Sequence, residues 1–137
     1  WKKRIRKIRM PGNKNILSIP VRPQDFFRSW VALTRPVHKL TDTESEVFAC
    51  FLKHRHELSK SISDPDLLDK VLMSEDVKKK IREECNIKGP HFQMVMVRIR
   101  KKKVLVGGKF IRLLIPNLTD ESQPFGLTFV LDIQNAG

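Results

Sequence analysis

The chain has 137 residues, 40% of them hydrophobic, and its 27 Lys and Arg against 15 Asp and Glu give a net charge of +12. That length predicts one domain with a modest core. No apolar run approaches the roughly 20 residues of a membrane-spanning helix, and no apolar stretch follows the charged first ten residues, so we expect neither a membrane partner nor a secretory signal.

The positive charge is concentrated in two stretches that contain no acid. Residues 1–24 and residues 85–119 each carry eight Lys or Arg, whereas residues 25–84 carry eleven bases and twelve acids. Two basic surfaces on a neutral scaffold are typical of a protein that binds a polyanion, most often nucleic acid. The alternative is a generally basic, soluble surface.

The N-terminal segment, residues 1–22, is predicted to be an extended arm because its prolines prevent a long helix. Residues 16–19 are expected to add one short edge strand. A short helix then begins at Pro23 and ends before Pro36. Its apolar face is predicted to comprise Phe26, Phe27, Trp30, Val31 and Leu33.

The next two helices carry clear start signals. Residues 41–44, Thr-Asp-Thr-Glu, form a capping box that opens a helix to about Leu58. Its buried stripe is predicted to be Val47, Phe48, Phe51 and Leu52, with His54, Arg55 and His56 outward or sideways. Ser63-Asp64-Pro65 starts a second, short helix with apolar Leu67, Leu68, Val71 and Leu72.

Two further helices and a hairpin are expected in the second acid-free stretch and just before it. Ser74 caps a helix whose face carries Val77, Ile81 and Cys85, and Asn86 ends it in a left-handed turn. Pro90 opens a helix to about Lys102. Residues 104–106 and 109–115 are predicted strands around Gly107-Gly108, and alternating Leu127, Phe129, Leu131 and Ile133 predict a final strand.

This order of elements predicts a winged helix-turn-helix-like domain, so the fold class is α+β and mainly helical. The expected organisation is a basic extended arm over residues 1–22 and a single domain over residues 23–137. The helix-turn-helix core spans about residues 41–115, its wing is the hairpin 104–115, and the C-terminal strand spans about residues 126–133. In such a fold the second helix of the pair enters the major groove and the wing lies along the backbone.

Helix 90–102 is the predicted recognition helix, with Phe92, Val95, Met96 and Ile99 on its inward side. Gln93 and Arg98 are expected to reach base edges, and the other basic groups to neutralise phosphates or line the surface. The predicted nucleic-acid-binding residues are Lys88, His91, Gln93, Arg98, Lys101, Lys102, Lys109 and Arg112.

Met94 and Val97 add apolar side chains beyond those the core of this helix needs. We therefore predict a protein interface there; the alternative is a wider core covered by the arm or the final strand. The arm residues Lys2, Lys3, Arg4, Arg6, Lys7 and Arg9 are expected to lie along phosphates or between subunits. The alternative for them is a solvated tail.

No catalytic or metal-binding pattern is found in the sequence. His54 and His56 stand two apart on a helix and diverge, and His38 and His91 stand alone, whereas a helical metal pair needs i, i+4 spacing. Asp64, Asp66 and Asp69 are explained by the helix dipole. We expect a non-enzyme without metal, cofactor or small-molecule substrate.

Four segments carry a resemblance to a known group of proteins: residues 38–44 (HKLTDTE), 79–87 (KKIREECNI), 99–105 (IRKKKVL) and 115–117 (IPN). They resemble small helix-turn-helix-type proteins of tailed bacteriophages of gut Bacteroidetes, the crAss-like phages. The resemblance implies a phage protein of the virion or genome-packaging gene set, in the virion or the host cytoplasm, and it implies no catalytic residue.

These features together predict an architectural protein of a nucleic-acid-containing assembly, most simply a phage virion component of the head–tail or portal region. Its partners would be other subunits, copies of itself included, and DNA. The alternative is a free DNA-binding regulator or packaging factor that recognises a specific site. A basic ribosome-associated protein is a third candidate within the architectural class.

Overall fold

A computed structural model describes residues 6–10, 14–131 and 134 of the chain. Within these residues the fold is α+β and mainly helical, as predicted. The elements in chain order are β1 (Arg6–Met10), β2 (Lys14–Ser18), η1 (Pro23–Asp25), α1 (Phe26–Leu33), α2 (Arg35–His38), α3 (Asp42–Ser59), α4 (Pro65–Leu72), α5 (Glu75–Glu84), α6 (Gly89–Lys101), β3 (Leu105–Val106), β4 (Lys109–Phe110) and η2 (Arg112–Leu114).

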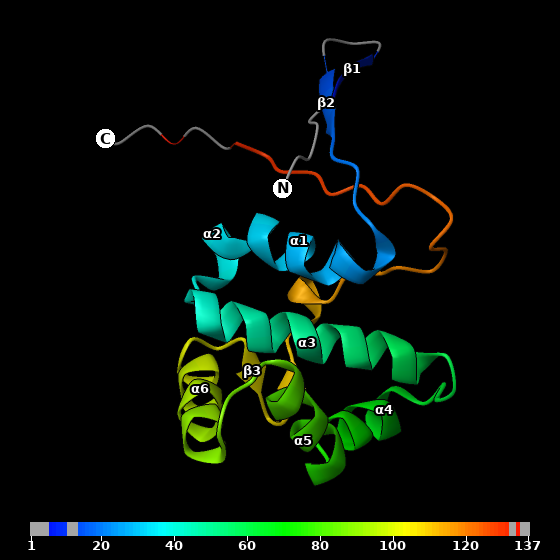
Figure 1. The fold of residues 1–137 in the computed structure, drawn as a ribbon. Coiled ribbons are helices and arrows are strands. Elements are labelled where there is room, and N and C mark those ends of the chain that lie inside the picture. The colour runs from blue at the N-terminus through cyan, green and yellow to red at the C-terminus, as the bar shows by residue number, and fades with distance from the viewer. Residues whose placement is uncertain (1–5, 11–13, 132–133, 135–137) are drawn as a thin grey trace.

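Helix α3 is the centre of the molecule, with α1 on one side and α4, α5 and α6 on the other (Figure 1). The predicted capping box is present, because the Thr41 side chain accepts from the Glu44 N–H and the Glu44 carboxylate accepts from the Thr41 N–H. The predicted stripe is buried, and Ala49 and Cys50 are buried as well. A helix that is buried over most of its circumference must be packed on several sides.

The core is built largely from phenylalanine rings. Phe48 and Phe51 of α3 lie 5.1 and 5.2 Å from the Phe110 ring of β4, and Phe92 of α6 lies 6.3 Å from Phe51. Ring pairs at these distances add attraction beyond their buried area. These contacts fix α6 and the β3–β4 hairpin against α3.

Buried polar groups in the first helices have partners. The Trp30 indole N–H donates to the Leu114 carbonyl at 2.8 Å, which ties α1 to η2. His38 donates from Nε2 to the Val31 carbonyl, and its Nδ1 accepts from the Leu40 N–H. Burial lowers the pKa of His38, so this ring is neutral and its tautomer is fixed by the two contacts. Leu33, predicted to be on the apolar face, is 43% exposed.

The N-terminal segment is not a single extended arm with one edge strand. Strands β1 and β2 pair antiparallel, with Ile8 opposite Ile16 and Arg6 opposite Ser18. The prolines exclude a helix but do not exclude a hairpin, and the dense charge of this segment concealed the strand pattern. The hairpin projects from the α1 side of the molecule (Figure 1).

The predicted C-terminal strand is absent from the described residues. Residues 123–131 have no regular secondary structure, and Phe129, Val130 and Leu131 are 53%, 80% and 90% exposed. Alternation alone cannot form a strand, because each strand needs a neighbour to pair with its backbone. Phe125 packs on the domain, because its ring lies 5.3 Å from Phe26 and 5.6 Å from Trp30. Ile133 lies outside the described residues.

No helix among the described residues is both long enough and apolar enough to cross a bilayer.

Candidate nucleic-acid interface

Helices α5 and α6 are joined by a turn whose geometry is set by backbone bonds. The Ser74 side chain caps α5 by accepting from the Val77 N–H. At the other end Asn86 has φ 52°, its N–H donates to the Glu83 carbonyl, and the Ile87 N–H donates to the Arg82 carbonyl. This pair of bonds is the Schellman arrangement that ends a helix. It confirms the left-handed position predicted for Asn86.

Helix α6 presents the predicted inward face to the core. Phe92, Val95, Met96 and Ile99 are each no more than 1% exposed. The predicted outward residues Lys88, His91, Gln93, Arg98 and Lys101 are all exposed. The 3.6-residue period of an amphipathic helix therefore placed these side chains correctly.

Several cations of this region have no acidic partner. Within the described part of the chain, no carboxylate lies within ion-pair distance of Lys88, Arg98, Lys101 or Arg112. Arg100 and Lys103 are exposed and unpaired in the same sense, and the predicted set omitted them. Both residues lie in the acid-free stretch 85–119, so counting every base of that stretch would have included them in the predicted binding set.

Lys102 differs from the other predicted phosphate contacts. Its amine donates to the Glu44 carboxylate at 2.6 Å and to the Lys39 carbonyl at 3.1 Å. Glu44 is only 1% exposed. Burial raises the pKa of Glu44, but the bonds from Lys102 and Thr41 outweigh burial and hold the pKa below its usual value. Lys102 thus compensates a buried charge between α3 and α6.

Lys109 on the hairpin also has a partner inside the protein. Its amine lies 2.8 Å from a carboxylate oxygen of Asp66 on α4. The hydrogen bond that Lys109 donates to Asp66 raises the pKa of Lys109. Both groups are exposed, so this pair is weak and a phosphate can compete for the lysine.

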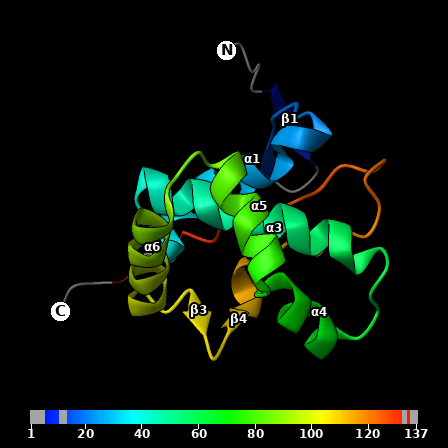
Figure 2. The same ribbon diagram turned by 60° about the horizontal axis from the view of Figure 1, so that its bottom comes forward.

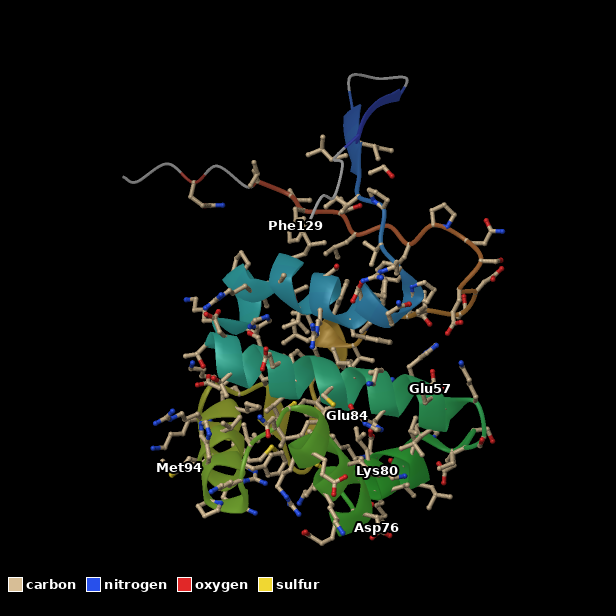
Figure 3. The ribbon with its side chains drawn as sticks, viewed as in Figure 1. Glu57, Asp76, Lys80, Glu84, Met94 and Phe129 are labelled. Atoms are coloured by element: carbon tan, nitrogen blue, oxygen red, sulfur yellow. The ribbon has the colours of Figure 1, made fainter. Side chains whose placement is uncertain are left out.

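The centre of the outer face of α6 is apolar. Met94 is 50% exposed and Val97 is 38% exposed, and Figure 3 shows Met94 pointing away from the protein at the edge of α6. Among the described residues, neither the N-terminal nor the C-terminal segment buries these two side chains. With about 100° of rotation per residue, Gln93 and Arg98 lie about 140° apart around the helix, on opposite flanks of this apolar centre.

The β3–β4 hairpin lies at the same end of the molecule as α6 (Figure 2). Its turn is the predicted Gly107-Gly108, with φ values of 60° and 75°. These angles suit the type I′ turn of a two-residue hairpin. The hairpin is shorter than predicted: each strand has two residues, and Arg112–Leu114 form a 3₁₀ helix. The Leu114 carbonyl accepts a hydrogen bond from the Trp30 indole N–H, and this contact bends the chain toward the core.

The other basic segment lies elsewhere. The β1–β2 hairpin projects on the α1 side, whereas α6 lies across α3 from it (Figure 1). Arg6, Lys7 and Arg9 belong to β1, and their side chains are not described. Lys2, Lys3 and Arg4 lie outside the described residues. The described parts of the two acid-free stretches therefore lie on opposite sides of α3.

The structure brings together one side-chain cluster that sequence reasoning missed. Metal-ligating atoms of Cys50, His54 and Glu84 all lie within 4.8 Å of one another. The prediction of no metal site considered His54 only with His56. The signal was present, because Cys50 and His54 are spaced i, i+4 on α3 and so share a face. The third residue comes from the end of α5, which spacing alone cannot place.

Comparison of the chain with protein-family models, with curated proteins and with solved structures finds no match.

Proposed function

We propose that this protein is a non-enzymatic architectural subunit of a nucleic-acid-containing assembly. It would contact DNA through the cations around α6 and a neighbouring subunit through the apolar centre of that helix. The observation that carries the proposal is the outer face of α6, where exposed Met94 and Val97 share one side of the helix with the unpaired cations Arg98 and Lys101. A face of this composition suits simultaneous contact with an apolar surface and with phosphates.

The order of α5, turn, α6 and glycine hairpin supports a winged-helix-like docking of this face. In that arrangement α6 approaches the groove and the β3–β4 turn lies along the backbone. Four cations would supply the phosphate contacts: Lys88 at the start of α6, Arg98 and Lys101 toward its end, and Arg112 beyond the hairpin. Lys102 is left out of the proposed interface, because removing it from Glu44 would leave a buried carboxylate uncompensated.

The basic N-terminal hairpin would be a second attachment point. Its position across α3 from α6 separates it from the proposed DNA-facing surface, so it suits anchoring to a neighbouring subunit or to another stretch of nucleic acid. Together with the resemblance noted in the sequence, this supports the proposal of a phage virion subunit near the head–tail or portal region.

The second candidate is a free regulator or packaging factor that reads a specific site. The observation in its favour is the row of exposed, unpaired Lys88, Arg98 and Lys101 on the second helix of the pair. The observation against it is the separation of Gln93 and Arg98. Two side chains about 140° apart on one helix cannot both face the floor of one groove.

Duplex binding at several salt concentrations separates the two candidates. The architectural protein is expected to bind random duplexes with Kd of about 10⁻⁴ to 10⁻⁶ M, and four phosphate contacts would weaken binding roughly 100-fold between 50 and 200 mM salt. Arg98→Ala should lower the salt slope by about one, while Arg28→Ala on the α1 side leaves it unchanged. Tight binding that one sequence competes far better than random duplex would exclude the architectural role.

The apolar centre of α6 is tested by association of the chain with itself. Met94→Glu or Val97→Glu is expected to shift the protein toward monomer in sedimentation velocity, because a buried contact cannot accommodate an unpaired carboxylate. Leu67→Glu on α4 is the matched control, since Leu67 is 49% exposed and Met94 is 50% exposed. Equal sedimentation of all three variants and the unmodified chain would remove self-association from the proposal.

A further inference from the structure

The cluster formed by Cys50, His54 and Glu84 lies where α3 meets the C-terminal end of α5, away from the outer face of α6. The Glu84 carboxylate joins the three residues: the Cys50 thiol donates to Oε2 at 2.8 Å, and the His54 ring N–H donates to Oε1 at 3.0 Å. Figure 3 shows Glu84 between the ribbons of α3 and α5. Cys50 is 9% exposed and the His54 side chain is 17% exposed.

A cation already occupies part of this cluster. The Lys53 ammonium lies 3.0 Å from the same Oε2 atom that accepts from Cys50. The Lys53 side chain is 44% exposed, so it can move into solvent without disturbing the core. The Glu84 carboxylate therefore faces a positive charge, and the Lys53 side chain that carries this charge is half-exposed.

We infer that Cys50, His54 and Glu84 form a Zn²⁺ site with three protein ligands and a fourth position open to water. A thiolate, an imidazole and a carboxylate are ligands that zinc accepts, and a sulfur ligand argues against Mg²⁺ or Ca²⁺. Tetrahedral zinc with bonds of about 2.0–2.3 Å holds its ligand atoms roughly 3.5 Å apart. The three atoms, all within 4.8 Å of one another, reach that spacing through small side-chain movements.

The charge and proton balance of binding follow from the contacts. Because the Cys50 thiol donates to the Glu84 carboxylate, the metal-free thiol carries its proton. Zn²⁺ displaces that proton to solvent, and Cys50 becomes the thiolate ligand. The His54 proton facing Glu84 moves to the other ring nitrogen, and Lys53 leaves for solvent. Zn²⁺ with one thiolate and one carboxylate is then neutral.

Such a site would tie α3 to the end of α5, one residue before the turn that leads into α6. Cys85 follows Glu84 directly, and its thiol donates to the Glu46 carbonyl at 3.9 Å. Its sulfur is not among the three clustered ligand atoms, so it is not assigned as a ligand. The inference concerns this junction alone and does not depend on DNA binding.

Cobalt titration of the full chain under a phosphine reductant tests the site. We expect one equivalent of Co²⁺ to produce a near-ultraviolet thiolate-to-metal charge-transfer band, which Zn²⁺ then abolishes by displacement. Calorimetry of Zn²⁺ binding in buffers of different ionisation enthalpy should show release of the Cys50 proton. Cys50→Ser is expected to remove the charge-transfer band.

Two matched pairs of variants separate ligation from a general effect on folding. His54→Ala should weaken zinc binding by roughly 100-fold or more, because even second-shell changes cost 10- to 100-fold; His56→Ala, whose ring contacts Glu121 instead, should not. Glu84→Gln should weaken binding likewise, and Glu83→Gln should not; all four positions lie outside the buried core. No stoichiometric binding, or equal binding by both members of each pair, overturns the inference. Cys50–Cys85 disulfide formation on oxidation without metal binding on reduction overturns it too.

Discussion

Lys102 illustrates how the role of one side chain depends on what lies opposite it. In the sequence it is one of three consecutive lysines at the end of a basic helix, which favours a phosphate contact. In the fold its amine meets the carboxylate of Glu44, which also closes the capping box of α3. A buried carboxylate requires a partner, so Lys102 stabilises the fold, whereas its neighbour Lys101 does not.

Lys102→Met is expected to lower the free energy of unfolding by roughly 2–3 kcal/mol at pH 7, since it leaves Glu44 buried without its cation. Lys101→Met, at an exposed position, should change it by less than about 0.5 kcal/mol. Urea unfolding of both variants measures the difference.

The dependence of stability on pH provides a second test of the Lys102–Glu44 pair. Because the pKa of Glu44 is lowered in the fold, its stabilisation is present above the unfolded value of about 4.5 and is lost as the pH falls through the folded value. The gap between the unmodified chain and Lys102→Met should therefore shrink at low pH. A gap that is constant from pH 7 to pH 3 would contradict the assignment.

At the scale of the element, α6 and the β3–β4 hairpin show which local signals are strong. The inward face of α6, its start near Pro90 and the left-handed Asn86 before it follow from periodicity and backbone preference, and all three are observed. The sequence did not predict the length of the hairpin. The chain turns away after two residues in each strand because the Leu114 carbonyl accepts from the Trp30 indole N–H.

The hairpin turn provides a test of backbone conformation alone. A Cβ at Gly107 would meet nothing within 4 Å, but φ there is +60°. Gly107→Val should cost about 1–2 kcal/mol of stability from the left-handed conformation. Gly107→Asn should cost clearly less, because Asn tolerates that region. Thermal unfolding compares the two variants, and equal losses would point to a contact instead of backbone strain.

At the scale of the whole molecule, the arrangement around α3 separates the two basic segments and leaves the end of the chain poorly covered. Phe125 packs on Phe26 and Trp30, and the residues after it are largely exposed. Among the contacts that hold the described C-terminal residues are the packing of Leu118 and Phe125 on the core and the His56–Glu121 pair, whose atoms lie 2.7 Å apart.

Phe125→Ala is expected to accelerate amide hydrogen exchange over residues 116–125, because it removes the ring that holds this segment on α1. Phe129→Ala, at a ring that is 53% exposed, should leave exchange there unchanged. Exchange measured by mass spectrometry distinguishes them. Equal exchange rates over residues 116–125 in the two variants would show that contacts other than the Phe125 ring, such as the His56–Glu121 pair, hold this segment.

The sequence by itself determined helices α1, α3, α4, α5 and α6, the caps at Thr41 and Ser74 and the inward face of α6, because hydrophobic period, capping residues and positive-φ positions act over a few residues. It did not predict the short helix α2. It did not determine whether the alternating apolar residues near the C-terminus form a strand, since a strand needs a pairing partner that only the fold supplies. It also did not reveal that Lys102 belongs to Glu44 or that Glu84 meets Cys50 and His54. Those contacts join residues that are 30 to 58 positions apart in the chain, and only tertiary packing brings them within reach.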